Sequence, residues 1–136
     1  MEFDTKFAIV VADDLLTWQK LNVVAFLSSG VVGGAEDILG EPYMDGSRQH
    51  YAPLCIQPIV ILKTSRERLR TFLDRANRRG VAAAVYIEDM FATGHDGANR
   101  ETVARYSTDA LPLVGMAARG DRKEIDKICK GAKLHD

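Results

Sequence analysis

Short apolar runs alternate with helical patterns along the chain. The runs at 7–12 (FAIVVA), 58–63 (PIVILK), 81–87 (VAAAVYI) and 113–117 (LVGMA) predict four buried strands. The segments between them include amphipathic stretches with helical spacing. Strands that alternate with helices predict an α/β fold of three layers, α/β/α. We expect a mixed, mostly parallel sheet of about four strands, with helices on both faces.

The strongest helix signal follows the second strand, in TSRERLRTFLDRANRRG. Thr64 and Glu67 fit a capping box at its start, and Gly80 is typical of the position beyond a helix end. Apolar side chains recur at i, i+3, i+4 and i+7, namely Leu69, Phe72, Leu73 and Ala76. This spacing predicts an amphipathic helix that packs its stripe on the sheet.

The segment 17–29 predicts a helix of a different kind, because it is apolar on nearly every side. Thr17 can cap its start and Gly30 can end it. Such a helix is covered on more than one side, either by the rest of the protein or by a second subunit. We therefore expect a homodimer.

Three further elements can be placed from the sequence. A short helix could span 100–106, and a last helix is expected from Asp121, with Glu124 as capping-box partner, to Gly131. Residues 31–56 allow two interpretations, a hairpin that turns at the Asp-Gly pair 45–46 or a long irregular loop. No repeat or linker divides the sequence, so we expect one domain over 1–136.

Composition narrows the function classes. Of 136 residues, 46% are hydrophobic, which is enough for one core without disulfides or a structural metal. The formal net charge of −1 does not fit a protein that binds nucleic acid by bulk electrostatics. Any nucleic-acid site, for example for tRNA, must therefore be a local patch.

The two cysteines and the N-terminal segment favour a cytoplasmic protein. Cys55 and Cys129 belong to no CxxC pair, so we expect reduced, half-buried thiols. The sequence begins without a secretory signal and contains no apolar stretch long enough for a bilayer. We expect no membrane partner.

Known cofactor and nucleophile motifs are absent from the sequence. There is no nucleotide-binding glycine fingerprint, Walker motif, GxSxG elbow or zinc-ligand pattern. The loop 93–97 contains one histidine and one aspartate, which is a weak metal motif. We expect no cofactor and no metal.

Polar residues follow the first and third predicted strands, where α/β proteins gather their ligands. Asp13 ends the first strand, and Lys20 lies early in the apolar helix. The lysine could neutralise a phosphate or an oxyanion, or it could extend to solvent from the helix end. We treat Lys20 as a candidate catalytic residue and Asp13 as a candidate substrate-binding residue.

The third strand leads into a second polar segment. Asp89 could orient or deprotonate a water molecule, and Thr93 could add a hydroxyl group to the same site. The alternative for both is an ordinary turn residue. Asn99 and Arg100 follow in the same segment and are candidates for substrate binding.

Arginines make one predicted helix basic, and they lie at positions 66, 68, 70, 75, 78 and 79. Such a face could contact a phosphate backbone. More often it is solvated and held by local ion pairs, which is the interpretation we favour.

Three segments resemble the peptidyl-tRNA hydrolase II family in the same order, and together they cover most of the chain. They are KFAIVVADDLLTWQKLNVVAFL, PIVILKTSRERLRTFLDRANRRGVAAAVYIED and PLVGMAARGDRKEIDKICKGAKL. The stretch MFATGHDGANRE and the ending KGAKLH are more similar to an uncharacterised bacterial family, a domain of unknown function that shares the peptidyl-tRNA hydrolase II fold. The resemblance therefore implies a peptidyl-tRNA hydrolase II-like fold for this chain.

The resemblance implies a hydrolase that cleaves the ester between a peptide and tRNA. It places Lys20, Asp89 and Thr93 at the family's lysine, aspartate and threonine. Val24 and Leu27 stand where the hydrolases carry glutamine and histidine, and Pro112 falls near the place of a second threonine.

Two functions from different classes follow. The first is hydrolysis of an ester or amide in a peptidyl-tRNA-like substrate. The second is a non-catalytic regulatory module that binds a small ligand or RNA.

Overall fold

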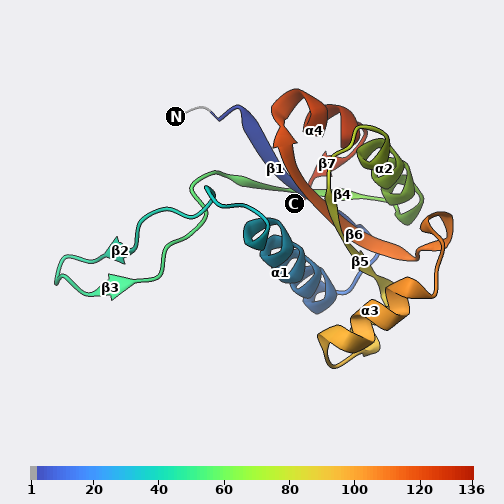
Figure 1. Ribbon diagram of the computed structural model, residues 1–136, viewed down its shortest axis with the longest axis horizontal. Helices are drawn as coiled ribbons and strands as arrows, with labels where there is room; N and C mark the ends of the chain where they lie inside the picture. Colours follow the sequence, from blue (N-terminus) through green and yellow to red (C-terminus); the bar gives the residue numbers. More distant parts are fainter. Residues whose placement is uncertain (1–2) are drawn as a thin grey trace.

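The structure is a computed structural model that describes residues 3–136. Its strands and helices follow one another along the chain as shown in Figure 1. The strands are β1 (Thr5–Ala12), β2 (Tyr43–Met44), β3 (His50–Tyr51), β4 (Ile59–Thr64), β5 (Ala83–Ile87), β6 (Leu113–Asp121) and β7 (Lys133–Leu134). The helices are α1 (Thr17–Gly33), α2 (Arg66–Arg78), α3 (Asp96–Ala104) and α4 (Arg122–Ile128), with 3-10 turns η1 (Glu88–Ala92) and η2 (Thr108–Ala110).

Five strands form the main sheet, in the order β5-β6-β1-β4-β7. Only β1 and β4 pair in parallel, whereas the β1–β6, β5–β6 and β4–β7 pairs are antiparallel. The prediction of a mixed α/β sheet is confirmed. The prediction that the sheet is mostly parallel, with about four strands, is wrong.

The connection between β5 and β6 explains the error. A parallel sheet requires a crossover that carries the chain back along a face of the sheet. Here η1, α3 and η2 stay near the end of β5, with α3 packed on η1, and the chain re-enters the sheet in the opposite direction as β6. The polar segment 88–112 therefore connects β5 to β6 at the end of the sheet where β5 finishes (Figure 1).

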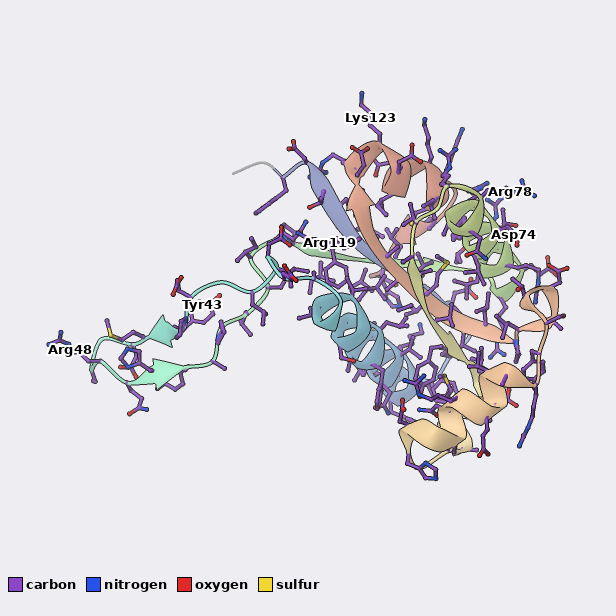
Figure 2. All side chains as sticks on the ribbon, viewed as in Figure 1. Tyr43, Arg48, Asp74, Arg78, Arg119 and Lys123 are labelled. Carbon is purple, nitrogen blue, oxygen red and sulfur yellow. The ribbon has the colours of Figure 1, made fainter. Side chains whose placement is uncertain are left out.

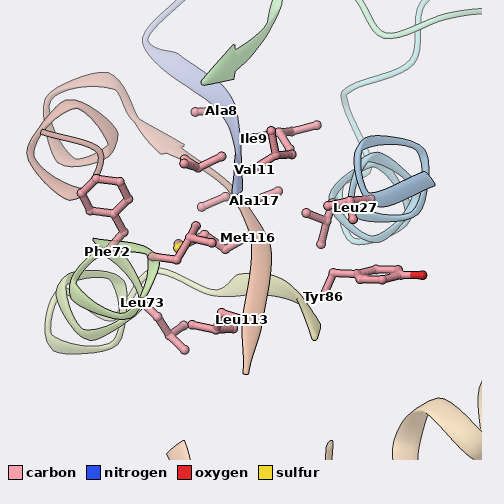
Figure 3. Packing of buried hydrophobic residues seen from close by; sticks show 14 of the residues in the cluster. Ala8, Ile9, Val11, Leu27, Phe72, Leu73, Tyr86, Leu113, Met116 and Ala117 are labelled. Atoms are coloured by element: carbon pink, nitrogen blue, oxygen red, sulfur yellow. The ribbon is translucent and has the colours of Figure 1, made fainter. Parts of the chain in front are cut away.

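Helices cover both faces of the sheet, as predicted. α1 packs on one face, against β1, β5 and β6, while α2 and α4 contact each other and β6 on the other face. Figure 3 shows Leu27 and Tyr86 on the α1 side and Phe72 and Leu73 on the α2 side. The four stripe residues of α2 are all buried, which confirms the helical spacing read from the sequence.

Helix α1 departs from the predicted bounds at both ends. The residue before the helix is Leu16, whose backbone N–H donates to Gln19 Oε1 at 3.0 Å, so Thr17 is the first helical residue and not the cap. The helix also continues past Gly30 to Gly33. Gly30 is tolerated inside the helix and lies beside β5, since a Cβ there would contact the Cβ of Ala84 at 3.5 Å.

The caps of two other helices were partly predicted. α2 is capped by Ser65, whose hydroxyl accepts from the Arg68 N–H, and not by Thr64. Gly80 lies beyond the end of α2 with φ +67°, as expected for that position. Asp121 caps α4 as predicted, but Glu124 forms an ion pair with Arg79 at 2.7 Å.

Helix α3 begins at Asp96, four residues before the predicted start, because His95 acts as its cap. The Nδ1 atom of His95 accepts from the Ala98 N–H at 3.1 Å. At the other end of the chain, α4 ends at Ile128, and Gly131 follows with φ +105°.

Residues 38–56 form a hairpin, and we call this segment the arm. Tyr43 in β2 lies opposite Tyr51 in β3, as the Asp-Gly interpretation predicts. Figure 1 shows the arm projecting from the body of the protein, and in Figure 2 Tyr43 and Arg48 lie along it, far from the helices. The alternative of an irregular loop is wrong.

Both cysteines are free thiols and half-buried, as expected. Burial raises the pKa of the Cys129 thiol to about 11, which keeps it protonated near neutral pH. No helix in the described part of the chain combines the length and apolar character needed to cross a bilayer.

Candidate functional site

The carboxyl ends of β1, β4 and β5 meet at one edge of the sheet, because the three strands run in the same direction. One arginine of α2 joins two carboxylates at this end of the sheet. Arg66 donates to Asp14 at 3.0 Å and pairs with Glu88 at 2.9 Å. The Asp14 hydrogen bond is the main reason that the pKa of this guanidinium is raised.

A cavity of about 380 Å³ lies beside this edge, between α1, β5 and the segment 90–99. Its volume falls in the range of small-molecule sites. Four aromatic side chains line it: Trp18, Phe26, Tyr86 and Phe91. Polar residues line the rest, among them Asn22, Thr93, His95, Asp96 and Asn99. We call this the aromatic cavity.

The aromatic residues form a continuous series of ring contacts. Trp18 meets Phe91 edge-on, with ring centroids 5.7 Å apart and an interplanar angle of 72°. Phe91 lies 5.2 Å from Tyr86, and Tyr86 lies 6.1 Å from Phe26. Trp18 and Phe26 are about half exposed (51% and 58%), so ring surface remains accessible to a ligand.

The polar end of the aromatic cavity is built by Thr93 and Asn99. The Thr93 hydroxyl lies 2.9 Å from the Met90 carbonyl oxygen and also contacts Asn99 Oδ1, although its single hydrogen can serve only one of them. Within residues 3–136, the Asn99 amide nitrogen makes no hydrogen bond. The oxygen lone pairs of Thr93 and the Asn99 amide can therefore bind a ligand.

The charges around the aromatic cavity favour a neutral ligand group. Asp96 occupies the first turn of α3, where its carboxylate satisfies the positive end of the helix dipole. The same carboxylate accepts from Arg100 at 2.7 Å. His95 accepts at Nδ1, so its neutral ring carries the hydrogen on Nε2, which is a donor at the rim.

Thr93 and Asn99 are the two predicted site residues that the structure brings together. Asp89 is half-buried nearby in η1, and its Oδ2 accepts from the Tyr106 hydroxyl at 2.8 Å. This hydrogen bond raises the pKa of Tyr106. Asp89 does not line the aromatic cavity. Among residues 3–136, only its Oδ2 accepts a hydrogen bond, so Oδ1 can accept one from a water molecule or a ligand.

The other three predicted residues are not brought into this cluster. Lys20 is half-buried in the first turn of α1, and the described residues place no carboxylate in ion-pair contact with it. Asp13 is exposed at the end of β1, where its N–H donates to the Thr64 carbonyl at 2.9 Å. Arg100 is held by Asp96 on the surface, with 79% of its side chain exposed.

Most of the basic residues of α2 make structural contacts. Besides Arg66, Arg70 donates to the carbonyl of Leu111 at 2.9 Å, and Arg79 pairs with Glu124. Arg75 donates to the carbonyls of Ile128 and Lys130 at 3.2 and 2.9 Å. These contacts favour the structural interpretation of the basic helix over a phosphate-binding face.

The aromatic residues of the site were missed in the sequence, although a signal was present. Trp18, Asn22 and Phe26 recur at intervals of four residues, which places them in one row along α1. The row did not stand out in the sequence, because α1 carries apolar residues on nearly every side. Tyr86 and Phe91 were assigned to a buried strand and a polar loop.

A larger cavity of about 720 Å³ lies between the C-terminal part of α1 and the start of β5. Its walls are mostly small residues, including Gly30, Gly34 and Ala82–Ala84, and its charged pair Asp37 and Arg119 is joined at 3.0 Å. It offers few side chains for recognition, so the aromatic cavity is the better small-ligand site. Across residues 3–136, no cluster of three metal-ligating side chains occurs.

Comparison with known proteins places the chain in a family. No curated protein sequence matches it. A solved structure of a protein of unknown function from Agrobacterium tumefaciens strain C58 is 54% identical, with a TM-score of 0.97 over 99% of this chain and 100% of that one. The family model DUF2000, described as a protein of unknown function, matches residues 5–136. The chain belongs to the DUF2000 family.

Proposed function

We propose that this protein binds a small molecule with a flat heteroaromatic group, such as a nucleobase, in the aromatic cavity. The observation that carries the proposal is the series of four aromatic rings that leads to the polar pair Thr93 and Asn99. The rings offer surfaces for stacking, and the pair offers hydrogen bonds to the edge of the stacked group. Both kinds of contact are typical of base recognition.

The polar groups explain why a nucleobase is preferred to a plain aromatic ring. An asparagine amide can pair with the donor and acceptor edge of a base. The Thr93 hydroxyl and the His95 Nε2 donor add directional contacts around the same cavity. Filling the cavity with an apolar ring would leave these groups unpaired, which is costly.

Titration with nucleosides tests the proposal. Trp18 is the single tryptophan and lines the aromatic cavity, so its fluorescence, corrected for nucleoside absorption, reports binding there. We expect saturable quenching by at least one of adenosine, guanosine, cytidine and uridine, and none by ribose. Phe91→Ala should weaken binding roughly tenfold to a hundredfold, because stacking on one aromatic ring is worth about 1–3 kcal/mol.

Matched variants separate the site from general effects. Thr93→Val keeps the side-chain shape and removes the hydroxyl, so it should weaken binding about tenfold. Thr71→Val makes the same change at an exposed position of α2 and should bind like the wild type. Lack of quenching by all four nucleosides, or full affinity in Phe91→Ala, would contradict the proposal.

A second candidate is hydrolysis of an ester or amide in a peptidyl-tRNA-like substrate. The similarity to peptidyl-tRNA hydrolase II in Lys20, Asp89 and Thr93 supports it. The contact between Trp18 and Phe91 also supports it, because it packs the first turn of α1 against η1. Lys20 belongs to that turn of α1 and Asp89 to η1. In this mechanism Lys20 stabilises the oxyanion and Asp89, oriented by Tyr106, positions water.

Turnover of peptidyl-tRNA tests this second function. Asp89→Asn keeps the size of the side chain and an acceptor for Tyr106 but removes the charge. We expect it, and Lys20→Ala, to lower turnover about 100-fold, in the range of general acid–base effects. Asp109→Asn, at an exposed carboxylate in η2, should retain full turnover. Unchanged turnover in both site variants would exclude the mechanism.

A further inference from the structure

The arm has a backbone ladder of its own beyond the body of the protein. At its root, the Ile56 N–H donates to the Ile38 carbonyl at 2.8 Å, and the Gly40 N–H donates to the Leu54 carbonyl at 3.0 Å. Nearer the tip, β2 and β3 form a second, separate stretch of pairing. Only the root residue Ile38 is fully buried.

The tip of the arm is a specific structure. Asp45 accepts from the N–H groups of Ser47 and Gln49 at 2.8 and 3.0 Å and from the Tyr51 hydroxyl at 2.8 Å. The hydrogen bond from Tyr51 is the main reason that the pKa of Asp45 is lowered. Arg48 closes the turn with φ 70°. A turn with this many internal contacts holds the two strands of the arm in one register.

The sides of the arm are apolar and open to solvent. Six large hydrophobic side chains are between 48% and 62% exposed: Leu39, Tyr43, Met44, Tyr51, Leu54 and Ile56. A two-stranded hairpin without further packing is only marginally stable in water. A built arm with apolar sides therefore indicates a surface that another chain covers.

The solvent-accessible surface area of the chain is larger than expected for a folded monomer of its mass. The chain exposes 8585 Å², whereas a folded monomer of 15.0 kDa is expected to expose about 7,000 Å². The excess of about 1,500 Å² is what one subunit of a large homodimer interface buries.

The larger cavity offers a place for the arm. It lies beside β5, which is an edge strand of the sheet. Edge strands are normally protected by charges or proline, but β5 reads AAVYI. The small side chains at 82–84 and the glycines at 30 and 34 let another backbone approach closely.

We propose that two copies of this chain form a symmetric dimer by exchanging arms, with each arm lying in the larger cavity beside β5 of the other copy. The root of the arm adjoins this cavity in its own subunit, since Ala35, Glu36 and Asp37 line it. A twofold axis close to the root lets each arm cross to the partner, and the same contact is then made twice. The exchange covers both the arm and the open edge.

Sedimentation equilibrium at micromolar concentration tests the dimer. We expect wild-type protein at twice the chain mass of 15.0 kDa. The double variant Met44→Lys/Leu54→Lys places two positive charges on the arm. We expect it to sediment with the mass of one chain. Ala82→Lys, at an exposed position in the larger cavity, should do the same from the receiving side. Leu134→Lys adds the same charge at an exposed position on β7 and should remain dimeric.

The results distinguish the exchange from other arrangements. A wild-type protein at the single chain mass would overturn the dimer, and a dimer that persists in either the arm or the Ala82 variant would overturn the exchange. Circular dichroism confirms folding, and if the arm variant does not fold, the Ala82→Lys variant decides alone. Nucleoside binding is measured on the same samples, so failure of this inference is separable from failure of the proposed function.

Discussion

Replacing Phe72 by alanine is expected to lower the free energy of unfolding by about 3–5 kcal/mol. Phe72 is fully buried on α2, and Figure 3 shows its ring between α2 and α4. The Arg75 guanidinium lies over this ring, 5.4 Å from its centroid. Removal of the ring leaves a cavity on the α2 side of the sheet. Denaturant unfolding followed by circular dichroism measures the change.

Thr71→Ala is the matched control, because Thr71 precedes Phe72 on the same helix and is exposed. Its effect should be within about 0.5 kcal/mol. A small loss of stability in Phe72→Ala would mean that α2 does not pack on the sheet as described.

The second large effect is expected on the other face, where Gly115→Ala should cost about 2–3 kcal/mol. Gly115 lies in β6 directly beneath α1. A Cβ there would overlap with Val23 Cγ1 and would lie 3.1 Å from Leu27 Cδ1 and 3.3 Å from the Val10 carbonyl oxygen. Val23 is stiff and fully buried, so the helix itself must move outward.

Gly120→Ala provides the comparison on the same strand. A Cβ at Gly120 would meet its nearest neighbour, Ile125 Cδ1, at an ordinary 3.6 Å. Its melting temperature should therefore stay near that of the wild type, while that of Gly115→Ala falls by several degrees. Equal melting temperatures for the two variants would contradict the close approach of α1 to β6.

Local patterns in the sequence were sufficient for most elements. The stripe from Leu69 to Ala76 is buried as predicted, because helical spacing and burial of one face follow from the same local pattern. The hairpin at Asp45-Gly46 was predicted for a similar reason, because the Asp45 carboxylate accepts hydrogen bonds from backbone N–H groups of the turn itself. In both cases the deciding interactions lie within a few residues.

Strand direction could not be predicted in the same way. The segment 88–112 contains a helix, and a helix between two strands usually indicates a parallel crossover. α3 instead packs on η1 beyond the sheet, and β6 returns antiparallel to β5. Whether a helix lies on a face or at an edge depends on contacts between distant segments, which the pattern of one segment does not contain.

The candidate site was predicted only in part. Thr93 and Asn99 were found because polar residues after a strand are typical of ligand sites, and they do line the aromatic cavity. Trp18 and Phe26 were overlooked because an apolar residue in an apolar helix suggests core packing. The close pairing of Lys20 with Asp89 in one pocket stays a prediction, since neither lines the cavity.

The central claim is that the aromatic cavity receives a flat heteroaromatic group. Nuclear magnetic resonance of labelled protein during titration with the nucleoside that quenches Trp18 most tests it directly. We predict saturable shifts at the Trp18 indole N–H and at the amides of Phe91, Thr93 and Asn99. Shifts confined to residues 30–37 and 82–84, around the larger cavity, or no saturable shifts at all, would contradict it.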